Sequence, residues 1–219
     1  MSLLDFARGP ALQIAMAIFV LGLMWRLVSL LGLPRAKDRS VKRPGTPSAA
    51  AAAVSGFVRH LWVPKSMGQT SMFSQINGYV FHIGLAIIVF GFAQHIMFIR
   101  GLFGIGWPGL PTSVISVVGI VTLASLVAAL VRRMTSPVLK MISTPNDYFT
   151  WLVTALPVLT GLLAVSHLGA RYETLLAIHL LSIAAMLIWF PFGKLMHAFL
   201  VFVTSSGTAI AYSRRGVKL

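Results

Sequence analysis

The sequence contains no cysteine, and only four of its 219 residues are acidic. Without cysteine the chain cannot form a disulfide, bind a metal or an iron–sulfur cluster through thiolates, or attach a c-type haem through thioether bonds. A redox cofactor bound by this chain would need histidine or another non-thiol ligand. Charged residues make up 10% of the chain, against about 25% in an ordinary soluble domain, so a soluble fold is not expected.

Apolar residues dominate the composition. They make up 57% of the chain, and the mean hydropathy is +0.87, which indicates an integral membrane protein. Lysine and arginine are in large excess, because 18 of them give a formal net charge of +14. In a membrane protein such an excess marks cytoplasmic loops that meet anionic lipid and partner protein. Nucleic acid is therefore not an expected partner.

Long apolar runs predict an all-α, integral membrane five-helix bundle that forms one domain. The predicted spans are 11–33, 78–99, 113–131, 145–166 and 174–203, within a single membrane domain over residues 1–219. Each span is close to the roughly 20 residues that a transmembrane helix needs. Thr144, Pro145 and Asp147 provide a hydroxyl cap, a first-turn proline and an acid for the start of the fourth span.

The cations are distributed unevenly between the two sides of such a bundle. Segments on one side carry three of them, and segments on the other side carry 14. The positive-inside rule then places the N-terminus outside and the C-terminus in the cytoplasm of a bacterial-type inner membrane. The loop 34–75 becomes cytoplasmic, and its alanine-rich stretch predicts a short surface helix from Ala49 to Leu61.

Four histidines lie within the predicted spans. His179 and His197 are 18 residues apart, which is five helical turns, so one helix would present both on the same face about 27 Å apart. With the orientation above, His82 matches His197 in depth on the cytoplasmic side, and His95 matches His179 on the outer side. Histidine within a span is costly and usually functional. Two pairs at two depths predict two haem irons, each with two axial imidazoles.

The spacing in the second span does not fit an ideal helix. His82 and His95 are 13 residues apart, which leaves them about 140° apart around the helix axis. Three explanations are open. The span is bent or bulged near Gly84 or Gly91, it lies between the two cofactors, or His95 is not the outer ligand and His167 replaces it.

Several segments resemble the gamma (cytochrome b) subunit of respiratory nitrate reductase and its relatives in sulfur-metabolism redox complexes. The segments that carry the resemblance are FVLGLMWR ending at Arg26, FHIG around His82, STPNDY with LTGLL after it, and WFPFGKLMH ending at His197. The last is the most specific, because the family shares its 18-residue histidine spacing. In the second span the family has its second histidine ten residues after the first, where this chain has Phe92.

The resemblance implies a membrane subunit that binds two b haems and takes electrons from quinol on the outer side. It implies delivery of these electrons to an iron–sulfur subunit and a larger catalytic subunit on the cytoplasmic side. It matches His82 and His197 to the inner haem ligands and His179 to an outer ligand. Such a subunit oxidises quinol or reduces quinone but does not act on the terminal substrate. The departure at Phe92 implies a relative with another partner.

Polar and aromatic residues in the outer turns are candidates for quinone contacts. They are Arg100, Trp107, His167, Arg171, Tyr172 and Glu173. The alternative is ordinary anchoring of these side chains at the membrane interface. Lys194 could pair with a haem propionate or extend to the inner membrane surface.

Two other functional hypotheses stay open at this point. One is a non-redox membrane anchor or a small transporter that uses intramembrane histidines for protons or metal. The other is a version of the cytochrome that binds only the inner haem. The sequence does not identify the partner, the terminal substrate or the direction of electron flow.

Overall fold

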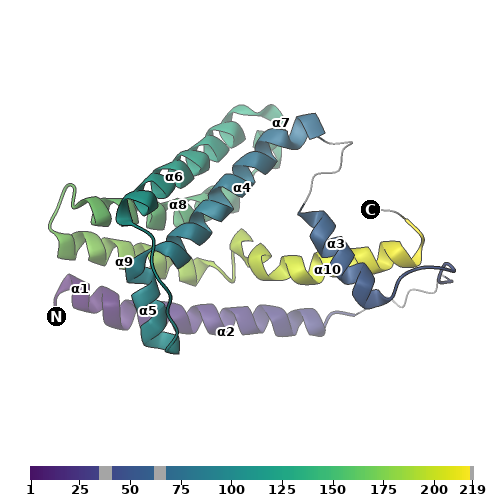
Figure 1. The fold of residues 1–219 in the computed structure, drawn as a ribbon, viewed down its shortest axis with the longest axis horizontal. Coiled ribbons are helices and arrows are strands. Elements are labelled where there is room, and N and C mark those ends of the chain that lie inside the picture. Colours follow the sequence, from purple (N-terminus) through teal and green to yellow (C-terminus); the bar gives the residue numbers. More distant parts are fainter. Residues whose placement is uncertain (35–40, 62–67, 218–219) are drawn as a thin grey trace.

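The computed structural model describes residues 1–34, 41–61 and 68–217, and the regular structure in these ranges is all helical (Figure 1). The helices are α1 Leu3–Phe6, α2 Leu12–Leu31, α3 Ala49–His60, α4 Gly68–Gly91, α5 Ala93–Phe103, α6 Thr112–Thr135, α7 Pro137–Ile142, α8 Pro145–Ser166, α9 Tyr172–Trp189 and α10 His197–Arg214. A π-helical turn, η1 at Ala7–Ala11, joins α1 to α2, and a 3-10 turn, η3 at Lys194–Met196, precedes α10.

Six helical segments in the described part of the chain are long and apolar enough to cross a membrane. They are Leu3–Leu31, Met72–Gly91, Thr112–Thr135, Pro145–Ser166, Tyr172–Trp189 and Lys194–Arg214. Between 6% and 33% of the most apolar window in each segment is buried inside the protein, so most of these apolar side chains face outward. Such a surface suits lipid and not water. The chain is therefore a multi-pass, all-α membrane protein.

The fourth predicted span agrees with α8, Pro145–Ser166, at both ends. Its start has the expected chemistry, because Thr144 and Asp147 form a reciprocal capping box. The first span begins earlier than predicted, at Leu3, where Ser2 and Asp5 form a second capping box. Pro10 does not end this helix because it lies in the π-helical turn.

The sequence predicts one fifth helix over 174–203 with a kink at Pro191, and its continuation past this proline was wrong. Helix α9 ends at Trp189 and α10 begins at His197, so His179 and His197 lie on separate helices. Pro191 has no N–H to continue the ladder. The amides of Phe192 and Gly193 instead turn back to the Trp189 carbonyl, at 3.0 and 2.8 Å. Gly193 then adopts an extended backbone, with φ −96° and ψ −175°, before η3.

Helix packing follows a row from α4 through α6, α8 and α9 to α2, in which each helix contacts the next (Figure 1). Leu126, Ala155 and Val158 form a buried cluster between α6 and α8, against which side chains of α4 also pack. The Asn77 side-chain amide of α4 donates to the Ser125 carbonyl of α6 at 3.0 Å, and the Ser125 hydroxyl lies 3.0 Å from the Asn77 carbonyl and 2.8 Å from its Oδ1. This polar pair fixes the register of two otherwise apolar helices.

Helix α10 lies outside this row. In Figure 1 it extends away from the end of α9 and does not fold back along it. It packs against α3, the helix expected within the loop 34–75. Phe57 stacks on Phe202 with ring centres 5.1 Å apart, and a side chain at Gly56 would overlap Ala209. The C-terminal helix is therefore attached to the loop after the first span.

Candidate functional site

The structure brings His82 of α4 beside His197, the first residue of α10. Their ring centres are 6.0 Å apart, and the ring planes are nearly perpendicular at 83°. Both residues are exposed at the surface of the helices, so their rings are accessible to a further group. This inner pair joins residues 115 positions apart in the sequence, on helices that the sequence predicted to match in depth.

His95 of α5 lies beside His179 of α9. Their ring centres are 6.3 Å apart, and the ring planes are nearly parallel at 15°. Both residues are half-buried. His167, the reserve candidate, stacks on Tyr172 instead, with ring centres 5.1 Å apart. The outer pair therefore contains His95 and not His167.

A break between α4 and α5 explains how His95 reaches this position. Phe92 leaves the helical conformation, with φ −78° and ψ 126°. The Gly91 carbonyl accepts from the amide of Leu110 at 2.8 Å. Because the break reorients α5 relative to α4, the 140° expected for one straight helix no longer applies. Of the three explanations for the spacing, the interruption near Gly91 is the one found.

Each of the four imidazoles has its Nδ1 atom engaged by a neighbouring oxygen. Three of the partners are backbone carbonyls: Gly78 for His82 at 2.7 Å, Lys194 for His197 at 2.7 Å, and Ile88 for His95 at 2.9 Å. The fourth is the Thr160 hydroxyl, 3.2 Å from Nδ1 of His179. A carbonyl can only accept, so it fixes the proton on Nδ1 and leaves the Nε2 lone pair for a ligand.

The separation of the rings fits one metal ion between each pair. Imidazole nitrogen lies about 2.0 Å from a bound metal ion, and the centre of a five-membered ring lies about 1.1 Å from its nitrogen. Two opposed imidazoles on one ion then have centres about 6.2 Å apart. The observed 6.0 and 6.3 Å agree with this value. The donor set and the spacing of the ring centres are therefore compatible with one metal ion held between the two histidines of each pair.

Within the described ranges, no group of three or more His, Asp or Glu side chains is arranged to hold a metal ion. A structural or catalytic zinc needs three or four protein ligands. Haem iron needs only one or two, because the porphyrin supplies the others. The two pairs thus suit a macrocycle-bound metal better than a bare ion. Gly161 of α8 leaves room for the outer pair, since a Cβ there would lie 3.0 Å from Cε1 of His179.

No protein-family profile matches the sequence. A protein of the bacterium Nitratidesulfovibrio vulgaris, strain Hildenborough, is 30% identical to it over 216 residues, which is 96% of this chain and 94% of that protein. The two chains belong to one family. The relative's name, "Protein", states no activity, so the likeness shows kinship over the whole membrane domain and leaves function to be argued from the site.

Lys194 pairs with a carboxylate that the sequence analysis did not connect with it. Its ammonium group lies 2.5 Å from the carboxylate of Asp147, which also contacts Arg133 at 3.0 Å. The Asp147 side chain is 3% exposed. Sequence reasoning assigned Asp147 only to the helix start and did not find this ion pair. The signal available was its rarity, as one of four acidic residues in the chain.

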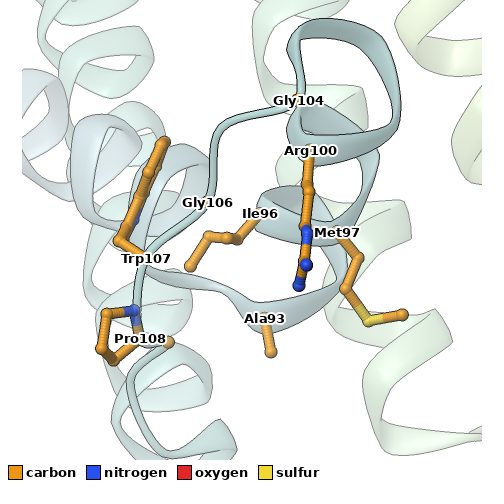
Figure 2. Close-up of a pocket in the computed structure, with 9 residues that line it drawn as sticks. Ala93, Ile96, Met97, Arg100, Gly104, Gly106, Trp107 and Pro108 are labelled. Carbon is orange, nitrogen blue, oxygen red and sulfur yellow. The ribbon is translucent and has the colours of Figure 1, made fainter.

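The residues predicted to contact quinone separate into two groups. Arg171 and Glu173 form an exposed ion pair at 3.5 Å, with side chains 86% and 62% exposed, in the same turn as the His167–Tyr172 stack. Arg100 instead lines a cavity of about 540 Å³ with Trp107 and the α5 residues Ala93 and Ile96 (Figure 2). The Trp107 indole N–H donates to the Phe90 carbonyl at 2.6 Å. This bond fixes the ring at the cavity wall.

Proposed function

We propose that this protein is a dihaem cytochrome b subunit of a respiratory redox complex. It would transfer electrons between the quinone pool and an iron–sulfur partner, with a larger catalytic subunit beyond. The observation that carries the proposal is the pair of facing imidazole sets, His82 with His197 and His95 with His179. In each set the ring spacing fits one iron, and every Nδ1 has an oxygen partner.

Bound between each pair, a haem b would supply reversible one-electron transfer at its iron. The chain's own residues do the remaining work. The backbone carbonyls at Nδ1 of His82, His95 and His197 would orient these rings and leave Nε2 as the ligand atom, and the Thr160 hydroxyl would orient the ring of His179. The outward apolar faces of the helices would place both centres within the membrane.

The proposed orientation keeps the N-terminus outside and the C-terminus in the cytoplasm of an inner membrane. Two features support it: the excess of cations on one side, and the packing of α10 against α3 of the cation-rich loop. In this arrangement α9 crosses the membrane and α10 extends from its cytoplasmic end, so the chain crosses five times although six helices are long enough. The inner pair, at the α9–α10 junction, then lies nearest the cytoplasmic partner.

The cavity of Arg100 and Trp107 is proposed as the quinone site. Its volume of about 540 Å³ lies within the range of small-molecule pockets, about 300–1,000 Å³. Figure 2 shows Arg100 and Trp107 on opposite sides of it, with Ile96 between them. Arg100 can donate to a quinone carbonyl, and the fixed indole of Trp107 offers a flat apolar wall. The cavity borders α5, the helix that carries His95.

Purification after haem-replete expression tests the proposal. We expect two haems per chain, measured as pyridine haemochrome against protein. His82→Ala and His197→Ala should each remove one haem, and His95→Ala and His179→Ala should each remove the other. His167→Ala is the matched control and should retain both. A colourless wild-type protein would refute the proposal and favour a non-redox anchor or a transporter. A single haem that His95→Ala leaves in place would indicate that the chain binds only the inner haem.

Membrane extracts from a native host identify the partner. An iron–sulfur protein that co-purifies with the chain, and is reduced by quinol only in its presence, is the expected result. Failure of quinol to reduce the haems of the purified complex would contradict the electron-transfer role.

A further inference from the structure

Asp147 occupies a place unlike those of the other described acidic residues. Asp5 and Glu173 are exposed, whereas the Asp147 side chain is 3% exposed. Its two oxygens have separate partners. Oδ2 accepts from the amide and hydroxyl of Thr144, both at 3.0 Å, and Oδ1 contacts the cations of Arg133 at 3.0 Å and Lys194 at 2.5 Å.

The helix cap does not account for the cations. Ser2 and Asp5 form the same capping box at the start of α1, and no lysine or arginine lies within ion-pair distance of that carboxylate in the described structure. A capping box is therefore complete without a cation. Burying the Asp147 carboxylate needs charged partners, because an isolated ion is strongly disfavoured away from water. The question is what the buried ion pair holds in place.

Lys194 gives the answer, because it contacts both Asp147 and the inner pair. It is the first residue of η3, in the segment that joins α9 to α10. Its ammonium group contacts Asp147, while its backbone carbonyl lies 2.7 Å from Nδ1 of His197. The break at Trp189 frees this segment from any continuous helix, so its position depends on contacts with neighbours. Helix α8, which carries Asp147, is one element that η3 packs against.

We propose that Asp147 is a positioning residue for the inner histidine pair and acts through Lys194. The ion pair fixes the junction of α9 and α10 against the first turn of α8, and the Lys194 carbonyl then sets the tautomer and direction of the His197 ring. This inference rests on the proposed function, since its effect is measured on the haem that the inner pair would hold. Arg133 contributes charge to the cluster, where its guanidinium contacts Asp147 and the Ser143 hydroxyl.

The first test compares Asp147→Asn with Asp5→Asn. Asparagine can still accept from Thr144, so the cap is largely retained while the charge is lost. Loss of a partner that orients a metal-bound histidine typically weakens metal binding about 10- to 100-fold. We expect transfer of the inner haem to an excess of haem scavenger to increase by that factor, and its midpoint potential and reduced spectrum to shift. The outer haem should be unchanged, and Asp5→Asn should leave both haems as in wild type.

The second test uses Lys194→Met and Lys194→Arg. Methionine removes the cation at a side chain that is 55% exposed but leaves the carbonyl in place, so the fold should tolerate it even if Asp147→Asn does not fold. Lys194→Met should weaken retention of the inner haem as Asp147→Asn does, and Lys194→Arg should retain that haem nearly as well as wild type. The double variant Asp147→Asn with Lys194→Met should lose the inner haem no faster than either single variant.

Three results separate the possible conclusions. Wild-type protein without haem would refute the proposed function. Wild-type protein with two haems, and a Lys194→Met variant whose inner haem has unchanged retention, potential and spectrum, would refute the positioning role alone. Equal weakening of both haems in Lys194→Met would also refute it, because that result indicates a general loss of stability.

Discussion

Replacing Gly161 with a larger residue tests whether the outer histidine pair depends on space that α8 leaves open. A Cβ at this position would lie 3.0 Å from Cε1 and 3.4 Å from Nδ1 of His179. The ring cannot simply move away, because Nδ1 lies 3.2 Å from the Thr160 hydroxyl and the ring faces His95. Gly161→Val adds two methyl groups beyond the Cβ and should displace the imidazole.

The expected effect of Gly161→Val on the free energy of folding is the sum of two opposing contributions. Replacing a glycine inside a helix lowers the free energy of folding by up to about 1 kcal/mol. Overpacking a filled site raises it by about 1–3 kcal/mol, so the change in global stability should be small. The effect on the outer centre should be larger, because a metal-binding geometry tolerates displacements of only about 0.5 Å. If the steric cost of about 1–3 kcal/mol falls on the ligand, retention of the outer haem weakens roughly 5- to 150-fold.

The assay measures the rate at which each haem is lost to a scavenger, with a melting temperature for the whole protein. Gly207→Val is the matched control, since Gly207 is also a helical glycine and a Cβ there meets nothing within 4 Å. We expect Gly161→Val to lose the outer haem quickly and retain the inner one, and Gly207→Val to retain both. An outer haem held equally tightly in the two variants would refute the argument that Gly161 provides the space for His179.

Three further predictions follow from the fold and the cavity. Arg100→Leu should raise KM for quinol without changing haem content, and an unchanged KM would place the quinone elsewhere. Ser125→Ala removes the hydroxyl that donates to Asn77, while the backbone carbonyl that accepts from the Asn77 amide stays. Stability should fall by about 0.6–1.7 kcal/mol, measured as a shift of the melting temperature with both haems present. The proposed orientation can be tested with single cysteines, because the chain has no native cysteine. Leu168→Cys should react with a membrane-impermeant maleimide in intact cells, and Val217→Cys should react only after lysis. Reaction of Val217→Cys in intact cells would show that α10 crosses the membrane.

The helices with simple local signals were predictable from sequence. The start of α8 was predicted because a hydroxyl cap, a proline and an acid occur at adjacent, well-defined positions. The histidines that face each other were also predictable, since span order and the positive-inside rule determine which residues share a depth. These inferences need only local chemistry and alternation of direction, so they survive errors in the detailed path of each helix.

The breaks in the helices were harder to predict. Pro191 alone would bend a helix, and that was the basis for one kinked span. In the structure Gly193 adopts an extended backbone just after it, so the chain leaves the helix completely. At Phe92 the sequence offered three alternatives, and the contact that accompanies the break is the Gly91 carbonyl with Leu110. That partner belongs to a loop whose path the sequence does not give.

The ion pair between Asp147 and Lys194 could not be derived for a related reason. The two residues are 47 positions apart, and the Lys194 side chain lies on the 3-10 turn that follows the interruption of the fifth span. A continuous helix would have continued through Lys194 without the 3-10 turn that carries it here. The direction of the Lys194 side chain depends on the path of the chain after Trp189, which was not predicted.

The different ring angles of the two histidine pairs have an electronic consequence. In the proposed inner centre, nearly perpendicular rings of His82 and His197 would leave two d orbitals of a low-spin ferric ion close in energy. In the proposed outer centre, the nearly parallel rings of His95 and His179 would separate these orbitals. A frozen oxidised sample should therefore show a strongly anisotropic resonance with one large g value from the inner centre and an ordinary rhombic signal from the outer one. Paramagnetic resonance would then distinguish the two sites without any substitution.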